Sequence, residues 1–81
     1  MGVLTMKPVN PNTPIEELAT QYVMLRHNPR NYTFGGIHEE IQDRMSELFR
    51  IMADMRGVPN AAREIGRAEK ILQLMGMTLI K

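Results

Sequence analysis

The chain has 81 residues, of which 43% are hydrophobic and 23% are charged, and its formal net charge is +1. A chain of this length holds one domain at most, and because it has no cysteine, disulfides and cysteine-based zinc sites are excluded. The balanced charge is unlike that of proteins whose main task is to coat nucleic acid, so a nucleic acid polymer is an unfavoured partner.

Nothing in the sequence indicates a membrane protein. No stretch approaches the roughly 18 consecutive apolar residues that a membrane-spanning helix needs. The opening residues, MGVLTMKPVNPN, lack the long apolar region and the cleavage site of a secretory signal. We therefore expect a cytoplasmic protein with no membrane partner.

Residues 1–13 are expected to form an extended N-terminal arm, because Pro8 and Pro11 alternate with asparagine there. A single helical domain is expected over residues 14–81. The arm and the helical domain together account for the whole chain.

The first helix is predicted to run from residue 15 to about Arg26. Thr13 is placed to cap it, Pro14 suits the first helical position, and Glu16 lies three residues after the cap, as in a capping box. Pro29 then prevents the helix from continuing.

Residues 27–36, HNPRNYTFGG, are predicted to form a loop that ends in two glycines. This loop carries the basic Arg30 and two of the four aromatic residues of the chain, Tyr32 and Phe34. One interpretation is structural, with the aromatic side chains closing the edge of the core. The other is a lid over a ligand, in which a ring stacks on a base and Arg30 binds a phosphate.

The second helix is predicted from Ile37 to Arg56. Its apolar residues recur at steps of three or four, which is the period of one helical face. These residues are Ile37, Ile41, Met45, Leu48, Met52 and Met55. Gly57 is a candidate for the C-terminal cap, and residues 58–60 are predicted to form a tight turn.

The third helix is predicted from Ala61 to Leu79, packed against the second helix in a long antiparallel hairpin. Its apolar stripe alternates steps of four and three at Ala61, Ile65, Ala68, Leu72, Met75 and Leu79. More apolar residues widen the stripe beyond one contact surface, namely Ile71, Leu74, Met77 and Ile80. We therefore expect an all-α fold, with a short N-terminal helix plus this hairpin, that assembles as a helical homo-oligomer.

The sequence offers little for catalysis or for a metal. Ser46 is the only serine, and the two histidines, His27 and His38, lack the spacing of a HExxH zinc site. No glycine-rich phosphate loop is present, and the carboxylates of the second helix are typical of a solvated face. We expect no enzymatic activity, no metal and no cofactor.

Basic residues follow one line of the third helix. Arg63, Arg67 and Lys70 lie four and three residues apart, and the same spacing continues to Lys81. In one interpretation these cations keep an apolar helix soluble. In the other they form an anion site where several copies of the helix meet, because symmetry repeats each charge.

The stretch ELFRIMADMRG and the residues that follow it form a pattern that resembles a known family, the phage anti-CBASS proteins that act as sponges for cyclic oligonucleotide second messengers. The last helix of that family reads Arg, an apolar residue, Ala, Leu-Gln, Gly, Met, Leu and Arg. This chain offers Arg63, Ile65, Ala68, Leu72-Gln73, Gly76, Met77, Leu79 and Lys81. Gly76 is displaced by one position and Lys81 replaces the final Arg. The match covers about residues 45–81.

The resemblance implies a compact homohexamer that binds cyclic di- or trinucleotides in pockets between subunits and sequesters them without catalysis, in the cytoplasm of a bacterial host. In that family a Tyr and a Lys hold the ligand, and Tyr32 and Arg44 are the nearest candidates here. With Arg30, Arg63 and Lys81 they make up the expected ligand-binding residues.

Two other functions remain open from the sequence. Eight methionines suit an adaptable helical surface, as in an inhibitor or adaptor that docks on a host protein. Residues 58–75 can also be aligned with a helix-turn-helix, with Gly66 at the turn, although Arg67 falls where that motif needs an apolar residue. A weak DNA-binding regulator is the less favoured of the two.

Overall fold

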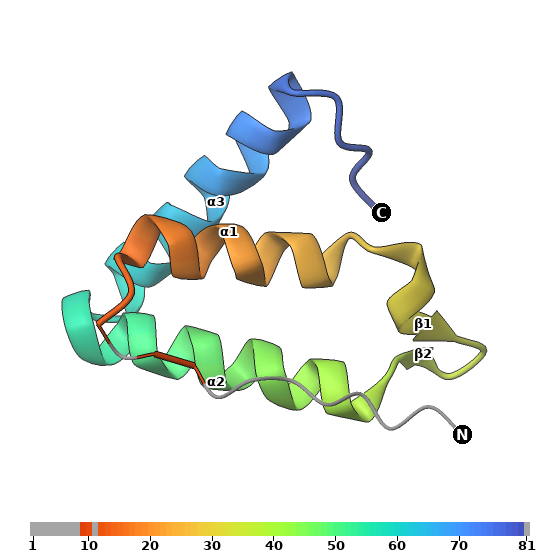
Figure 1. Cartoon of the computed structure of the whole chain (residues 1–81), viewed down its shortest axis with the longest axis horizontal. Coiled ribbons are helices and arrows are strands. Elements are labelled where there is room, and N and C mark those ends of the chain that lie inside the picture. Colours follow the sequence, from red (N-terminus) through yellow and green to blue (C-terminus); the bar gives the residue numbers. More distant parts are fainter. Residues whose placement is uncertain (1–8, 11, 81) are drawn as a thin grey trace.

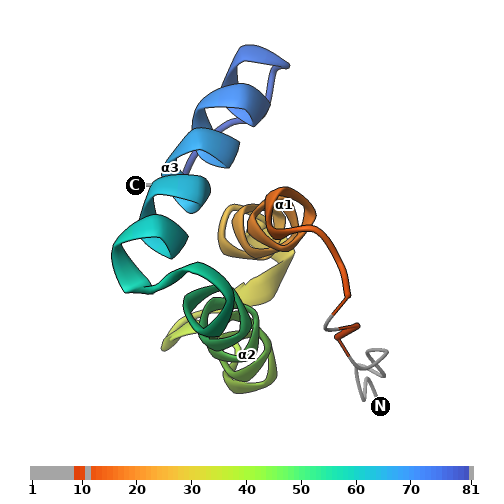
Figure 2. The same cartoon turned by 90° about the vertical axis from the view of Figure 1, so that its left-hand side faces the viewer.

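The computed structural model describes residues 9, 10 and 12–80, and this part of the chain is mostly helical. Its elements, in chain order, are α1 (Ile15–Arg26), the 3-10 helix η1 (Pro29–Asn31), β1 (Tyr32–Thr33), β2 (Gly36–Ile37), α2 (Glu39–Arg56) and α3 (Val58–Leu74). Figure 1 shows α1 and α2 side by side in opposite directions, joined at one end by the β1–β2 hairpin. Figure 2 shows α3 leaving the other end of α2 at a steep angle and packing on α1.

Helix α1 has the predicted bounds, but the predicted capping box does not form. The helix has no side-chain hydrogen bond at its N-terminal cap, and Pro14 occupies the cap position with an extended ψ of 145°. Thr13 therefore lies one residue outside the helix, and its backbone N–H donates to the Asn10 carbonyl at 3.0 Å. The Pro14 carbonyl instead accepts the first helical hydrogen bonds, from the N–H groups of residues 17 and 18.

The predicted loop over residues 27–36 is in part ordered as a hairpin. Tyr32 pairs with Ile37 and Thr33 with Gly36 in an antiparallel register. Gly36 has a φ of +108°, which glycine adopts without strain. Ile37 thus belongs to β2, and the second helix begins at Glu39, two residues later than predicted.

A single residue, Gly57, connects α2 to α3, and the tight turn predicted for residues 58–60 is wrong. Gly57 has a φ of +87°, ends α2 and precedes the first residue of α3, Val58. Helices that lie side by side in an antiparallel hairpin need a connection of about two to eight residues. The predicted long hairpin of the second and third helices is therefore replaced by a corner, from which α3 diverges (Figure 1).

Helix α3 ends at Leu74, five residues earlier than predicted. Gly76, with a φ of +106°, donates its N–H to the Gln73 carbonyl at 3.0 Å, and Met77 N–H donates to the Leu72 carbonyl at 2.9 Å. These two bonds form a Schellman motif, which glycine favours at the end of a helix. Residues 77–80 then turn back toward the end of α1 (Figure 1). Residues 75 and 79 therefore do not extend the helical stripe, and Met75 is exposed.

The core lies between the three described helices. Its buried apolar residues come from α1 (Ile15, Leu18, Ala19, Val23), from α2 (Ile41, Leu48, Met52) and from α3 (Ala61, Ile65, Ala68). The stripe predicted for the third helix is confirmed for its first three residues. Val9, from the predicted arm, packs against this core, whereas residues 1–8 and 11 of that arm lie outside the described residues. None of the helices over residues 12–80 has the length and apolar character needed to cross a membrane.

Gly66, inside α3, and Gly76, just after it, provide a matched test of where α3 ends. A Cβ at Gly66 or at Gly76 meets no atom within 4 Å, but only Gly76 has a positive φ. Gly66→Ala should therefore raise the free energy of unfolding by about 0.5–1 kcal/mol, because alanine is the better helix former. Gly76→Ala should lower it by about 1–2 kcal/mol, because an L-residue is strained there. Urea denaturation measures both, and a change of the same sign in the two variants would contradict the helix end at residue 74.

Candidate functional site

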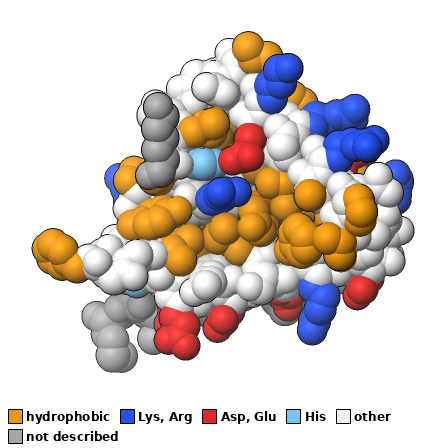
Figure 3. Space-filling model, turned by 180° about the vertical axis from the view of Figure 1, so that it is seen from behind, with side chains coloured by type: hydrophobic (Ala, Val, Ile, Leu, Met, Phe, Trp, Pro, Cys, Tyr) orange, Lys and Arg blue, Asp and Glu red, His pale blue; other side chains and the backbone are white. Residues whose placement is uncertain are grey.

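A groove of about 760 Å³ is lined by residues of α1, α2, the hairpin that joins them and the first residue of α3. Its apolar lining consists of Tyr22, Tyr32, Ile37, Met45, Phe49, Ala53 and Val58, and its polar lining of Arg26, Gln42, Ser46 and Arg50. Figure 3 shows the face on which apolar side chains form a band, with basic and acidic side chains along its edges. The groove is thus an apolar hollow with polar groups at its margin, the usual form of a small-molecule site.

Helix α2 presents two different apolar stripes. Ile41, Leu48 and Met52 face the core and are buried, whereas Met45 and Phe49 line the groove and are partly exposed. Sequence periodicity assigned Met45 to the core stripe and gave no role to Phe49. One sequence signal for a second stripe is that Met45 and Phe49 are four residues apart, so they share a helical face other than the one that carries the core residues.

Three of the four aromatic residues of the chain meet at the groove. The rings of Tyr22 on α1 and Phe49 on α2 lie 6.4 Å apart between centroids, with their planes at 51°. The Tyr32 hydroxyl donates a hydrogen bond to the Arg26 carbonyl, which closes the hairpin onto the end of α1. The fourth ring, Phe34, lies fully exposed at the hairpin tip. The groove therefore offers flat apolar faces from three separate elements.

Two arginines supply the positive charge of the groove. Arg26 is half exposed, and its Nη1 atom lies 4.0 Å from the Glu69 carboxylate. Arg50 is exposed and makes no hydrogen bond or ion pair among residues 9, 10 and 12–80. Arg50 can therefore contact an anion without first giving up an internal partner.

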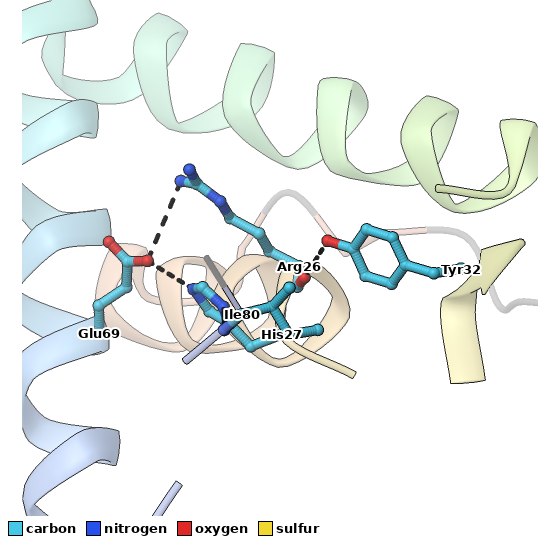
Figure 4. A network of polar contacts seen from close by, with 5 residues as sticks. All are labelled: Arg26, His27, Tyr32, Glu69 and Ile80. Atoms are coloured by element: carbon cyan, nitrogen blue, oxygen red, sulfur yellow. Dashed lines mark hydrogen bonds and ion pairs between the residues drawn. The ribbon is translucent and has the colours of Figure 1, made fainter. Parts of the chain in front are cut away.

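Next to the groove residue Arg26, the buried His27 is the centre of a polar network (Figure 4). Its side chain is 3% exposed, and its Nε2 atom lies 2.6 Å from Glu69 Oε2. Its Nδ1 atom accepts a hydrogen bond from the backbone N–H of Ile80 at 2.9 Å. The sequence placed His27 in the loop over residues 27–36, but the structure gives it a buried position between α1, α3 and the returning tail.

The structure brings Tyr32 to the groove but sets the predicted basic residues apart from it. Arg30 lies in η1 and lines a separate hollow with His38 and carboxylates from the start of α2. Arg44 is largely covered and pairs with the carboxylate of Glu47 at 3.0 Å. Neither of them lines the groove.

The remaining predicted ligand-binding residues belong to the third helical region. Arg63 is exposed on α3 and does not line the groove, and Lys81 lies outside the described residues. The groove residues that the sequence did not single out are Tyr22, Arg26, Phe49 and Arg50. They lie in two helices far apart in sequence, and helical spacing alone does not indicate that they meet.

Two further expectations concern metals and DNA. Among the described residues, no group of three or more histidine or acidic side chains is placed to hold a metal ion. Helix α3 is continuous through Gly66, so the turn that a helix-turn-helix requires at that residue is absent.

Comparison with known proteins identifies no relative of this chain. No protein-family model matches the sequence, and neither the curated proteins nor the solved structures include a match.

The two tyrosines of the groove test how the hairpin is fixed to α1. Tyr32→Phe should lower the free energy of unfolding by about 0.5–1.5 kcal/mol, because the hydrogen bond to the Arg26 carbonyl is lost. Tyr22→Phe is the matched control, since its hydroxyl makes no hydrogen bond to the described residues. Its effect should stay within about 0.5 kcal/mol in urea denaturation. Equal effects of both substitutions would contradict this role of Tyr32.

Proposed function

We propose that this protein is a non-enzymatic nucleotide-binding protein that sequesters a cyclic di- or trinucleotide in the groove between α1 and α2. The observation that carries the proposal is the meeting of three aromatic rings with Arg26 and Arg50 in one groove. A bacterial host cytoplasm is the compartment in which such a ligand would be sequestered.

The chemistry of the groove matches that of a cyclic oligonucleotide. Such a ligand combines flat bases with phosphate diesters. Stacking of a base on an aromatic ring contributes about 1–3 kcal/mol, and a guanidinium group can bind a phosphate through two parallel hydrogen bonds. A volume of about 760 Å³ is within the range of small-molecule pockets. The aromatic side chains and Arg50 supply both kinds of contact.

The lining of the groove supports binding rather than turnover. Besides the two arginines, its polar side chains are Gln42, Ser46 and the two tyrosine hydroxyls. None of these lining residues is a histidine or a carboxylate, the side chains that most often move protons in catalysis. A ligand held there meets no general base from the described residues that line the groove.

Self-association is part of the proposal. Near the end of α3, Ile71 and Leu74 are exposed three residues apart, so they share one side of the helix, and Met75, the residue after the helix, is exposed as well. Leu74 and Met75 have exposed fractions of 81% and 77%. A second copy of the chain would remove this apolar surface from water, in agreement with the hexamer that the family resemblance implies.

Docking on a host protein is the second candidate function. It is favoured by Phe34, which is fully exposed at the hairpin tip and borders a small hollow with Tyr32 and Thr33. An exposed aromatic ring of this kind is a typical anchor in protein–protein interfaces. The DNA-binding alternative has no comparable support, because the turn at Gly66 is absent.

The proposal is tested by calorimetric titration with a panel of cyclic di- and trinucleotides. Arg50→Ala should weaken binding by about 10- to 150-fold, which corresponds to the loss of one charge-assisted hydrogen bond. Arg63→Ala is the matched control, since Arg63 is an exposed arginine outside the groove, and it should bind as the wild type does. If Arg63→Ala weakens binding and Arg50→Ala does not, the ligand site lies on α3. If the wild type binds no cyclic nucleotide, docking on a host protein replaces sequestration.

Self-association is tested by light scattering after size-exclusion chromatography. At micromolar concentration the wild type should be larger than a monomer. Leu74→Asp should reduce the mass, because it places a carboxylate in the apolar contact. Met55→Asp, at an exposed methionine of α2, should leave the mass unchanged. A monomeric wild type would contradict the oligomer without bearing on the groove.

A further inference from the structure

The tail after α3 depends on one polar contact. Beyond Met77, the described residues of this tail make a single hydrogen bond, from the Ile80 N–H to Nδ1 of His27 at 2.9 Å. These two partners are 53 residues apart in sequence, and the segment between them includes α2 and α3 in full. A segment with one hydrogen bond and little buried apolar surface belongs to the less stable part of a fold, which can open while the core stays folded.

The geometry also determines the protonation state of His27 when the tail is bound. Because a backbone N–H only donates, Nδ1 must be unprotonated to accept from Ile80. The imidazole hydrogen is then on Nε2, which donates to the Glu69 carboxylate at 2.6 Å. The bound tail therefore requires the neutral imidazole with its hydrogen on Nε2.

We propose that His27 is a proton-operated latch that holds residues 78–80 while its imidazole is neutral and releases them when it is protonated. A proton from solvent binds Nδ1, which then becomes a donor and faces the Ile80 N–H, also a donor. The hydrogen bond to Ile80 is lost, and the two N–H groups repel each other. The Nε2–H group continues to donate to Glu69, so the junction of α1 with α3 is retained.

Two charged groups face this imidazole. Glu69, from α3, is the direct partner of Nε2 and stabilises the imidazolium form. Arg26, from α1, shares the Glu69 carboxylate at 4.0 Å and opposes a second positive charge beside it. The described tail residues, Met77 to Ile80, carry no charged side chain. Glu69 and Arg26 are therefore the charged side chains that a proton on His27 meets first.

Release of the tail changes the apolar surface at the end of α3. Met77 and Leu72 pack against the core where the tail begins, and Leu79 is partly buried farther along. Residues 71, 74 and 75 are already exposed nearby. The latch thus controls how much apolar surface this end of the molecule presents, whatever ligand the groove binds.

The experiment is an NMR titration of the full ¹⁵N-labelled chain from about pH 8 to about pH 5, the range in which an ordinary histidine changes charge. At the upper end, imidazole nitrogen shifts should identify the form with hydrogen on Nε2. As His27 takes up its proton, the protection factor of the Ile80 amide should fall by roughly two- to tenfold, as for one net hydrogen bond. The Ala68 amide, in the buried part of α3, should stay protected.

Two variants sharpen the test. Glu69→Gln keeps an oxygen acceptor for Nε2–H but removes the charge that favours imidazolium, so the tail should open at lower pH. His38→Gln is the control, because His38 is exposed and its side chain makes no hydrogen bond to the described residues. It should leave the opening unchanged.

Three results would contradict the proposal that protonation of His27 releases residues 78–80. The first is an Ile80 amide whose protection does not change while His27 titrates. The second is a neutral imidazole with its hydrogen on Nδ1. The third is simultaneous loss of protection at Ile80 and Ala68, since that would be unfolding of the domain rather than release of the tail.

Discussion

The hydrogen bond between His27 and Glu69 joins the end of α1 to the distal half of α3, 42 residues away in sequence. Its importance follows from the corner at Gly57. With one residue between α2 and α3, the chain itself does not bring α3 alongside α2, and the orientation of α3 depends on its contacts with α1 and with α2. A polar pair at the edge of the core can specify that orientation, because leaving the buried His27 imidazole unsatisfied costs about 1–3 kcal/mol.

This placement of α3 has a direct consequence for the groove. Because α3 diverges from α2, it leaves one face of the α1–α2 pair uncovered, and the rings of Tyr22, Tyr32 and Phe49 line that face. Arg26 belongs to both regions, since it lines the groove and pairs with Glu69. An anion that binds Arg26 competes with Glu69 for the guanidinium group. The groove and the buried network are therefore physically connected through one side chain.

The helical parts of this fold could be predicted from spacing and from proline and glycine. Helix α1 has its predicted bounds. The apolar stripe predicted for the third helix correctly indicated that Ala61, Ile65 and Ala68 are buried. The predicted helix ends are wrong where a glycine changes the backbone direction although the apolar pattern of the sequence continues. Gly76 stops α3 although the apolar pattern continues past it, and Gly57 makes a corner where a hairpin was predicted. In both cases a local backbone conformation decided the path of the chain.

The groove could not be predicted, for a different reason. Periodicity identifies apolar faces of a helix but does not say which face meets the core and which meets solvent. Met45 and Leu48 are both apolar and three residues apart, yet one lines the groove and the other is fully buried. The packing of α2 against α1 and α3 makes that distinction, and it consists of tertiary contacts. Tyr32 was singled out from the sequence, whereas the pairing of Tyr22 with Phe49 depends on how α1 packs on α2.

We propose that a cyclic nucleotide binds in the α1–α2 groove. The most direct measurement is a map of backbone amide shifts in the ¹⁵N-labelled protein during titration with a cyclic dinucleotide and then a cyclic trinucleotide. The groove predicts the largest shifts at Tyr22, Tyr32, Phe49 and Arg50, with saturation at a defined ligand ratio. Shifts confined to the basic line of α3, at Arg63, Arg67 and Lys70, would contradict it, as would a spectrum that neither ligand changes.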